Sequence, residues 1–230
     1  MKKNRISRAR KRTLNQPDEF VTVSSKVIKF VAEHKITVVS ILGIIVAVGM
    51  IIAGTCFFSN QAESKAFAML DKAVMKYKTS LTDKGVAEAL KDVNGDFQRI
   101  LDKYAQRKGG KLTGVVFANI CFDAGEVDRS IELYKKALEN FENRPAIKNL
   151  ALNGLGYAHE AKNEYETAAG YFEMIASASS PVMKTDAFFN IGRLYDLAGD
   201  MDKSRAAYEK IITEYPESMY IELVREKTAR

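Results

Sequence analysis

The stretch LNGLGYAHEAKNEYETAAGYF, residues 152–172, contains a pattern that occurs three times in the C-terminal half of the chain. Its polar turns centre on Gly125, Asn163 and Gly199, which lie 38 and then 36 residues apart. A small residue lies seven positions before and another five positions after each turn, and an aromatic residue lies nine positions after it. These residues are Ala118, Ser130 and Tyr134; Gly156, Ala168 and Phe172; and Gly192, Ser204 and Tyr208. The spacing predicts helix–turn–helix units in which small residues let two helices approach and an aromatic ring fills the gap between units.

This pattern resembles that of the tetratricopeptide repeat. The matching residues are Leu155-Gly156, Ala168 and Phe172 in one copy, and Ile191-Gly192, Tyr195, Gly199, Tyr208 and Pro216 in the next. The chain departs from the family at Gly114, where a tryptophan-like residue is usual, and at Ser130 and Ser204, where alanine is usual. The resemblance implies an all-α solenoid with repeats at about 111–144, 149–182 and 185–218, followed by a capping helix at 219–230.

Helical spacing of apolar residues also precedes these repeats, across residues 59–110. One helical face extends from Ala62 to about Thr79, and the sequence SLTDKG (80–85) is expected to break it. A second helix is predicted from about Val86 to Arg107, with Gly109-Gly110 at its C-terminal cap. We interpret residues 59–110 as a linker helix and a divergent first repeat.

The sequence ITVVSILGIIVAVGMIIAGTCFF, residues 36–58, contains no charged residue. A helix of this length covers about 34 Å, which is enough to cross a hydrocarbon core of about 30 Å. A cleaved signal peptide would have a shorter apolar core and small residues at its end, whereas this stretch ends in Phe57-Phe58. We therefore expect residues 36–58 to be an uncleaved transmembrane helix.

The charge distribution predicts the orientation of this helix. Residues 1–35 contain ten basic and three acidic residues, whereas residues 59–230 contain 25 basic and 26 acidic residues. Because basic flanks remain in the cytoplasm, the N-terminus is expected there and the C-terminal domain on the exported side. Residues 1–17 are expected to be a disordered basic tail, and residues 18–35 an amphipathic juxtamembrane helix at the membrane surface.

Small residues gather on one face of the predicted transmembrane helix. Gly43, Ala47 and Gly54 fall close together around the helix axis. Small residues at such spacing let a second helix approach closely, as in a dimer or a complex with a partner. Chance composition is the other interpretation, because glycine and alanine are common in membrane helices.

No local pattern of catalytic or metal-binding residues is present in the sequence. The only histidines are His34 and His159, and the two cysteines, Cys56 and Cys121, are expected to be unpaired. Acidic pairs on predicted turns, such as Asp200 and Asp202, are typical of solvated helix caps rather than of acid–base catalysis. We expect no enzymatic activity and no cofactor, and no nucleic-acid ligand because the basic tail has no interleaved aromatic residues.

The repeat resemblance also implies a partner-binding surface, which we call the concave groove. In tetratricopeptide domains the first helix of each repeat lines this face. The corresponding residues are Val115, Asn119 and Phe122; Asn153, Tyr157 and Glu160; and Phe189, Arg193 and Asp196. Asparagine and arginine can hydrogen-bond an extended backbone, and tyrosine and phenylalanine supply rigid contact area. Ordinary packing between helices is the alternative for each of them.

The layout of the whole chain is similar to that of the YfgM-type ancillary subunit of the bacterial Sec translocon. This resemblance implies a single-pass protein of the bacterial inner membrane, with a cytoplasmic N-terminus and a periplasmic C-terminal domain. It would be a scaffold that binds translocon subunits, periplasmic chaperones or exported polypeptides. The alternative is a self-associating organiser of the cell envelope or division site that uses the face containing Gly43, Ala47 and Gly54.

Overall fold

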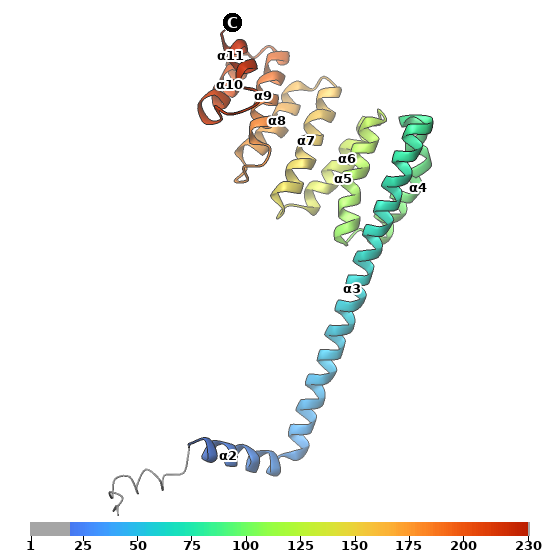
Figure 1. Ribbon diagram of the computed structural model, residues 1–230, viewed down its shortest axis with the longest axis vertical. Helices are drawn as coiled ribbons and strands as arrows, with labels where there is room; N and C mark the ends of the chain where they lie inside the picture. The colour runs from blue at the N-terminus through green and yellow to red at the C-terminus, as the bar shows by residue number, and fades with distance from the viewer. Residues whose placement is uncertain (1–18, 230) are drawn as a thin grey trace, which may run out of the picture. The chain divides into compact units, whose positions relative to one another are not determined.

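The structure is a computed structural model that describes the backbone of residues 19–229 and the side chains of residues 25–229 (Figure 1). The basic tail expected at 1–17 lies outside the described residues. All regular elements between residues 19 and 229 are α-helices, which confirms the predicted all-α class. The chain divides into two units, one ending at Ser59 and the other beginning at Asn60.

The first unit contains α2 (Glu19–Glu33) and the N-terminal part of α3 (Lys35–Lys84). The α2 side chains Val27, Phe30 and Val31 recur at helical spacing and are all exposed. His34 lies at the junction of the two helices, where its Nδ1 is 3.2 Å from the carbonyl oxygen of Phe30. By length and composition, α3 is the one helix among the described residues that could cross a membrane.

The end of α3 differs from the sequence expectation. The break expected at residues 80–85 is present but is confined to Gly85, with φ +82°, because the helix continues to Lys84. The last turn is held against the following helix by Asp92. This carboxylate accepts hydrogen bonds from Ser80 Oγ at 2.6 Å and from Lys84 Nζ at 2.7 Å.

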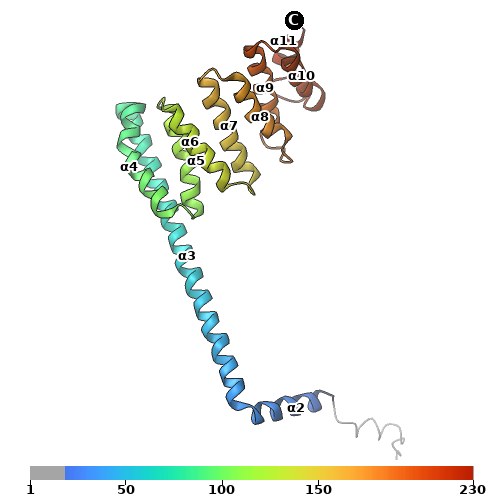
Figure 2. The ribbon, with the colours of Figure 1, turned by 180° about the vertical axis from the view of Figure 1, so that it is seen from behind.

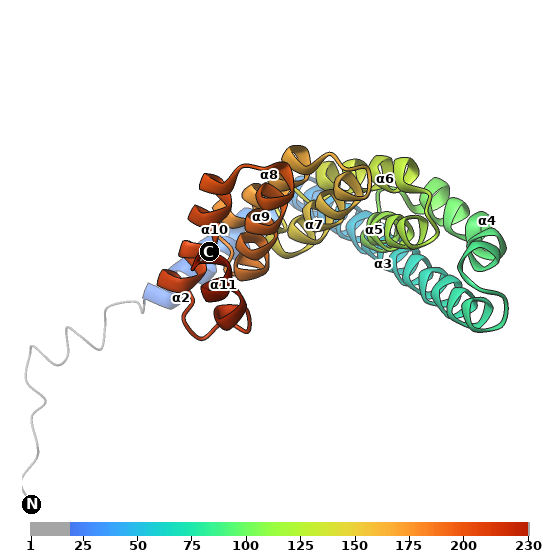
Figure 3. The same cartoon turned by 90° about the horizontal axis from the view of Figure 1, so that it is seen from above.

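The second unit continues with eight more helices that pack against one another in chain order. They are α4 (Val86–Tyr104), α5 (Lys108–Asp123), α6 (Val127–Asn140), α7 (Pro145–Ala161), α8 (Tyr165–Ser177), α9 (Lys184–Ala198), α10 (Met201–Glu214) and α11 (Ile221–Thr228). Figure 2 and Figure 3 show α5 to α10 as three successive helix pairs that lie side by side, followed by α11. The pairing produces a helical solenoid with α5, α7 and α9 as the first helices of their pairs.

Close packing between the helices of a pair depends on glycine. A Cβ atom at Gly156 on α7 would lie 2.4 Å from the Phe172 ring on α8, and one at Gly192 on α9 would lie 2.4 Å from the Tyr208 ring on α10. Tyr134 on α6 instead packs beneath Gly154, where a Cβ would lie 2.3 Å from the ring. The aromatic residues therefore occupy the space that the missing side chains leave.

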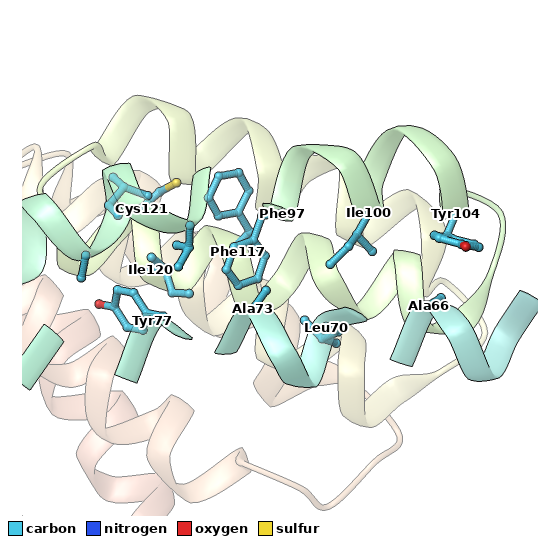
Figure 4. Close-up of a cluster of buried hydrophobic side chains, with 13 residues drawn as sticks. Ala66, Leu70, Ala73, Tyr77, Phe97, Ile100, Tyr104, Phe117, Ile120 and Cys121 are labelled. Atoms are coloured by element: carbon cyan, nitrogen blue, oxygen red, sulfur yellow. The ribbon is translucent and has the colours of Figure 1, made fainter. Parts of the chain in front are cut away.

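The C-terminal part of α3 and α4 form a further helix pair that precedes the three repeats. Figure 4 shows their buried side chains meeting those of α5. The Phe97 ring of α4 stacks on the Phe117 ring of α5, with centroids 4.9 Å apart and planes within 3° of parallel. Ile100 and Tyr104 of α4 are also buried in this cluster, and Leu101 is partly buried against it.

The boundary between α4 and α5 also differs from the expectation. α4 ends at Tyr104, so Gly109 and Gly110 belong to the first turn of α5 rather than to a C-terminal cap. Both glycines are buried where the backbone approaches its neighbours. A Cβ at Gly110 would lie 1.9 Å from the carbonyl oxygen of Tyr104, and one at Gly109 would lie 2.9 Å from Ala66 Cβ. The first regular helix pair consequently begins at Lys108 rather than at residue 111.

At the other end of the solenoid, α11 lies within the expected capping segment. Val224 is fully buried against α10. The neighbouring Leu223 is 45% exposed. The helix is short, and only one of its faces meets the preceding pair.

Candidate functional site

The concave groove is divided into three parts by its contacts. Five of its nine predicted residues meet around one cavity between α5 and α7. Glu160 and Arg193 pair with each other between α7 and α9. Phe189 and Asp196 contact the capping helix α11. The first part brings together most of the predicted groove residues around one hollow, so we examine it as the candidate binding site.

The α5–α7 cavity has a volume of about 350 Å³. It is lined by Val115, Asn119, Phe122, Asp123, Tyr134, Leu150, Asn153, Gly154 and Tyr157. Val115 is buried and belongs to the core, whereas 38% of Tyr157 and 48% of Leu150 are exposed. The lining thus combines an apolar and aromatic wall with amide and carboxylate groups, and this combination is typical of specific ligand sites.

A hydrogen bond holds the floor of this cavity in place. The Tyr134 hydroxyl donates to Asn119 Oδ1, which leaves the amide nitrogen of Asn119 available. The Tyr134 ring reaches this position because Gly154 has no side chain. Burial, with the nearby Asp123 carboxylate as a smaller cause, raises the pKa of Tyr134, so the phenol remains a neutral donor.

Four residues of the cavity were not among the sequence-predicted groove residues: Tyr134 and Gly154, described above, and Asp123 and Leu150. Asp123 is the last residue of α5, directly after Phe122, and Leu150 lies one turn before Asn153 on α7. Asp123 is exposed, and partial desolvation raises the pKa of its carboxyl. The sequence signal for both was their adjacency to predicted groove positions, because residues three or four apart share a helix face.

The second part of the groove is a polar link between α7 and α9. The Arg193 guanidinium donates to both carboxylate oxygens of Glu160, with Nη2 2.7 Å from Oε2. It also donates to Asn190 Oδ1 at 2.9 Å, and Asn190 Nδ2 lies 3.3 Å from the Tyr157 hydroxyl. The hydrogen bond to Glu160 raises the pKa of Arg193. These side chains satisfy one another and brace the site next to Tyr157.

The third part of the groove is covered by the capping segment. The Phe189 ring stacks on the Tyr220 ring with centroids 4.3 Å apart. The Tyr220 hydroxyl donates to Asp186 Oδ1 at 2.7 Å, which raises the pKa of Tyr220 to about 12. Lys227 Nζ lies 3.2 Å from Asp196 Oδ2. Phe189 and Asp196 are therefore engaged within the chain.

The small residues of the predicted transmembrane face are unobstructed within the first unit. Gly43 and Ala47 are exposed and Gly54 is half-exposed. A Cβ atom at Gly43 or Gly54 would meet nothing within 4 Å. The space that a partner helix would need is present on this face.

Other reactive side chains are sparse in the described part of the chain. Between residues 25 and 229 no group of His, Cys, Asp or Glu side chains is arranged to hold a metal ion. Both cysteines are free, with Cys56 exposed and Cys121 buried. Burial raises the pKa of the Cys121 thiol to about 11. His159 is buried, stacks on Tyr171 and hydrogen-bonds Glu164, as expected for a packed residue.

Comparison with known families defines the class of this domain. Residues 117–182 and residues 186–218 each match a family model of the tetratricopeptide repeat. These ranges extend from within α5 to the end of α10 and include all three small-residue and aromatic patterns of the sequence. The second unit therefore contains tetratricopeptide repeats, which as a class mediate protein–protein interaction.

Two solved structures share the helical-repeat fold of this chain. Two crystal structures of TPR-like repeats from Podosopora anserina, described as a kinesin light chain, are each 14% identical to this chain. The alignment with each structure covers 73% of this chain and 85% of the other chain, with TM-scores of 0.54 and 0.55. BtubC (BKLC) from P. vanneervenii is 15% identical and covers 89% of this chain and 87% of its own, with a TM-score of 0.47. No curated protein matches this sequence significantly.

Proposed function

We propose that this protein is a membrane-anchored interaction scaffold whose α5–α7 cavity binds a segment of a partner protein. The observation that carries the proposal is the cavity itself. It is open, it is lined by the exposed side chains of Tyr157 and Leu150, and it lies on the first helices of two repeats. Rigid aromatic residues next to amide groups suit an extended peptide, because they supply contact area and backbone hydrogen bonds together.

The anchor in this proposal is the N-terminal half of α3. Its apolar segment is long enough to span a bilayer, and its side chains from residue 36 to 58 are almost all exposed within the unit. The excess of basic residues before it supports a cytoplasmic N-terminus and an exported repeat domain. Helix α2, with exposed Val27, Phe30 and Val31, would lie on the cytoplasmic surface of the membrane.

The proposed setting is the bacterial inner membrane, with the repeats in the periplasm. It rests on the resemblance in layout to the YfgM-type subunit of the Sec translocon. In that setting the protein is an ancillary factor at the translocon that links it to periplasmic chaperones or holds emerging polypeptides. The absence of a recognisable catalytic arrangement in the sequence agrees with a scaffold rather than an enzyme.

Photo-crosslinking in cells tests this function. A photoreactive amino acid replaces Tyr157 in the cavity, and a matched variant carries it at Glu209, an exposed position of α10 outside the cavity. Adducts with translocon subunits, periplasmic chaperones or exported chains at position 157 but not at 209 are expected. Adducts with cytoplasmic proteins would overturn the topology, and identical adducts at both positions would overturn the role of the cavity.

Self-association is the alternative function, and the open face around Gly43 favours it. If position 157 crosslinks only to other copies of the chain, the envelope-organiser interpretation replaces the adaptor. The Gly43→Ile variant then provides the decisive comparison, because a larger side chain would block close approach of a second helix. An unchanged oligomer on blue-native gels would exclude this face as the dimer contact.

A further inference from the structure

The α5–α7 cavity contains a carboxylate that no cation of the described chain neutralises. Asp123 lines the cavity and makes no hydrogen bond or ion pair with any side chain between residues 25 and 229. No lysine, arginine or histidine of the described residues contributes to the lining. Asp123 is exposed, so water solvates its carboxylate in the free chain and the charge is accessible to a cation that enters the cavity.

The other charges of the groove face do not compensate for Asp123. Arg193 is engaged by Glu160, and Lys227 is engaged by Asp196. Asp186 adds a further carboxylate, which accepts from the Tyr220 hydroxyl. Asp196 also lines a hollow, but it does so together with its partner Lys227, whereas Asp123 lines the α5–α7 cavity without a cation.

The remaining walls of the cavity suit a long aliphatic chain that ends in a cation. Phe122, Leu150 and Tyr157 provide apolar and aromatic surface along which methylene groups can pack. An ammonium or guanidinium group is also attracted to the face of an aromatic ring. The amides of Asn119 and Asn153 can bind the backbone on either side of such a residue.

We propose that the α5–α7 cavity binds a lysine or arginine side chain of the partner segment, with Asp123 as the counter-charge. This inference rests on the proposed function and specifies its ligand as a basic segment with apolar neighbours. A volume of about 350 Å³ accommodates one such side chain. An acidic residue would be repelled by Asp123, and a purely apolar residue would leave its carboxylate further desolvated.

Peptide binding to the full-length chain in detergent micelles tests the proposal. The probes are fluorescein-labelled peptides with identical flanking sequence that differ only at one central residue: lysine, arginine, norleucine or glutamate. Lysine and arginine peptides should bind roughly three- to tenfold more tightly than the norleucine peptide in fluorescence anisotropy, and the glutamate peptide most weakly. Added salt should weaken the lysine preference and leave the norleucine affinity nearly unchanged.

Variants assign the preference to Asp123. Asp123→Asn and Asp123→Ser should remove the advantage of lysine over norleucine while norleucine binding persists. Asp123→Lys should reverse the order, so that the glutamate peptide binds more tightly than the lysine peptide. Glu139→Gln makes the same change of charge at an exposed position of α6 outside the cavity and should leave all four affinities unaltered.

The dependence on pH has a defined sign. Because the pKa of Asp123 is raised, the carboxylate loses its charge at a higher pH than an ordinary aspartate does. The lysine preference should be complete at neutral pH and should disappear as pH falls through that pKa, whereas norleucine binding should not change. In Asp123→Asn this acid dependence should be absent.

The outcomes separate this proposal from the proposed function. Equal affinity for lysine and norleucine, or a lysine preference that survives Asp123→Asn, would overturn the basic-side-chain site. Failure of all four peptides to bind would overturn it as well. Crosslinking at position 157 decides independently whether the cavity still contacts a partner protein in the cell.

Discussion

Glu63 on α3 caps the N-terminus of α5, 46 residues further along the chain. Its Oε1 accepts a hydrogen bond from the backbone nitrogen of Gly109 at 2.7 Å, and its Oε2 accepts one from that of Lys108 at 3.0 Å. The first amides of a helix have no partner within the helix, and a carboxylate is favourable there because of the helix dipole. The helix that leaves the apolar segment is thereby joined to the first regular repeat.

We predict that Glu63→Ala destabilises this junction by about 1–2 kcal/mol, because two helix amides lose a charged acceptor. Urea unfolding of the full chain in detergent, followed by circular dichroism, measures the change. Hydrogen exchange should show faster exchange at Lys108 and Gly109. Glu132→Ala, at an exposed position of α6, is the control and should have little effect. Unaltered exchange at both amides would contradict the capping role.

Alanine substitutions at two glycines in neighbouring helices should change the stability of the protein in opposite directions. In Gly156→Ala the new Cβ would collide with the Phe172 ring, and overpacking of this kind costs about 1–3 kcal/mol. Gly170 lies inside α8 with nothing within 4 Å of a Cβ, so Gly170→Ala should stabilise by about 0.5–1 kcal/mol. The midpoint of thermal unfolding, measured for both variants and for the wild type, tests the two predicted changes. Equal shifts would show that glycine at 156 is not required for packing.

The Arg193–Glu160 pair should be energetically coupled across the two repeats. Both side chains are partly buried, with 30% and 24% exposed, so solvent screens the interaction less than at the surface. A double-mutant cycle with Arg193→Met and Glu160→Gln should give a coupling energy of about 1 kcal/mol. High salt should reduce this energy only in part. A coupling energy indistinguishable from zero would mean that the interaction between Arg193 and Glu160 does not contribute to stability.

Cys121 should be unreactive in the folded protein. In a Cys56→Ser background, Ellman's reagent should label Cys121 at least roughly a hundredfold more slowly in the native chain than in denaturant. Burial raises the pKa of the Cys121 thiol from 9.0, the value in the unfolded chain, to about 11 in the folded chain. The protonated thiol therefore contributes its full stabilisation below pH 9.0, and this stabilisation is lost as the pH rises through the folded-state pKa. The native chain should therefore lose stability in this alkaline range, and Cys121→Ala should reduce that loss. Rapid stoichiometric labelling at neutral pH would contradict the burial.

The membrane position of α2 can be measured with tryptophan, because the chain contains none. Phe30→Trp should emit at shorter wavelength in nanodiscs with anionic lipid than in neutral ones, since the apolar face enters the interface and basic residues bind the anionic headgroups. Replacing both Lys26 and Lys29 by glutamate should weaken this difference. Phe58→Trp, at the end of the apolar segment, is the control and should respond little to lipid charge. Emission typical of water in both lipids would place α2 away from the membrane.

The repeat fold and the candidate membrane helix follow from the sequence alone, because both depend on local periodicity and composition. The recurrence of Gly156 with Phe172 and of Gly192 with Tyr208 records a contact within one helix pair, at a fixed separation along the chain. Continuous apolar character from residue 36 to 58 needs no knowledge of neighbouring segments. Both signals depend only on which residues follow one another along the chain.

Only the tertiary structure decided where helices end and which groove residues are open. Ser80 and Lys84 remain helical because Asp92, in the next helix, accepts their hydrogen bonds, and Gly109 joins α5 where it meets Ala66. Phe189 occupies the same repeat position as Asn153, which lines the cavity, yet Phe189 is covered because α11 places Tyr220 on it. Contacts between distant segments override local preference in each case, and they also bring Asp123 to the wall of the cavity.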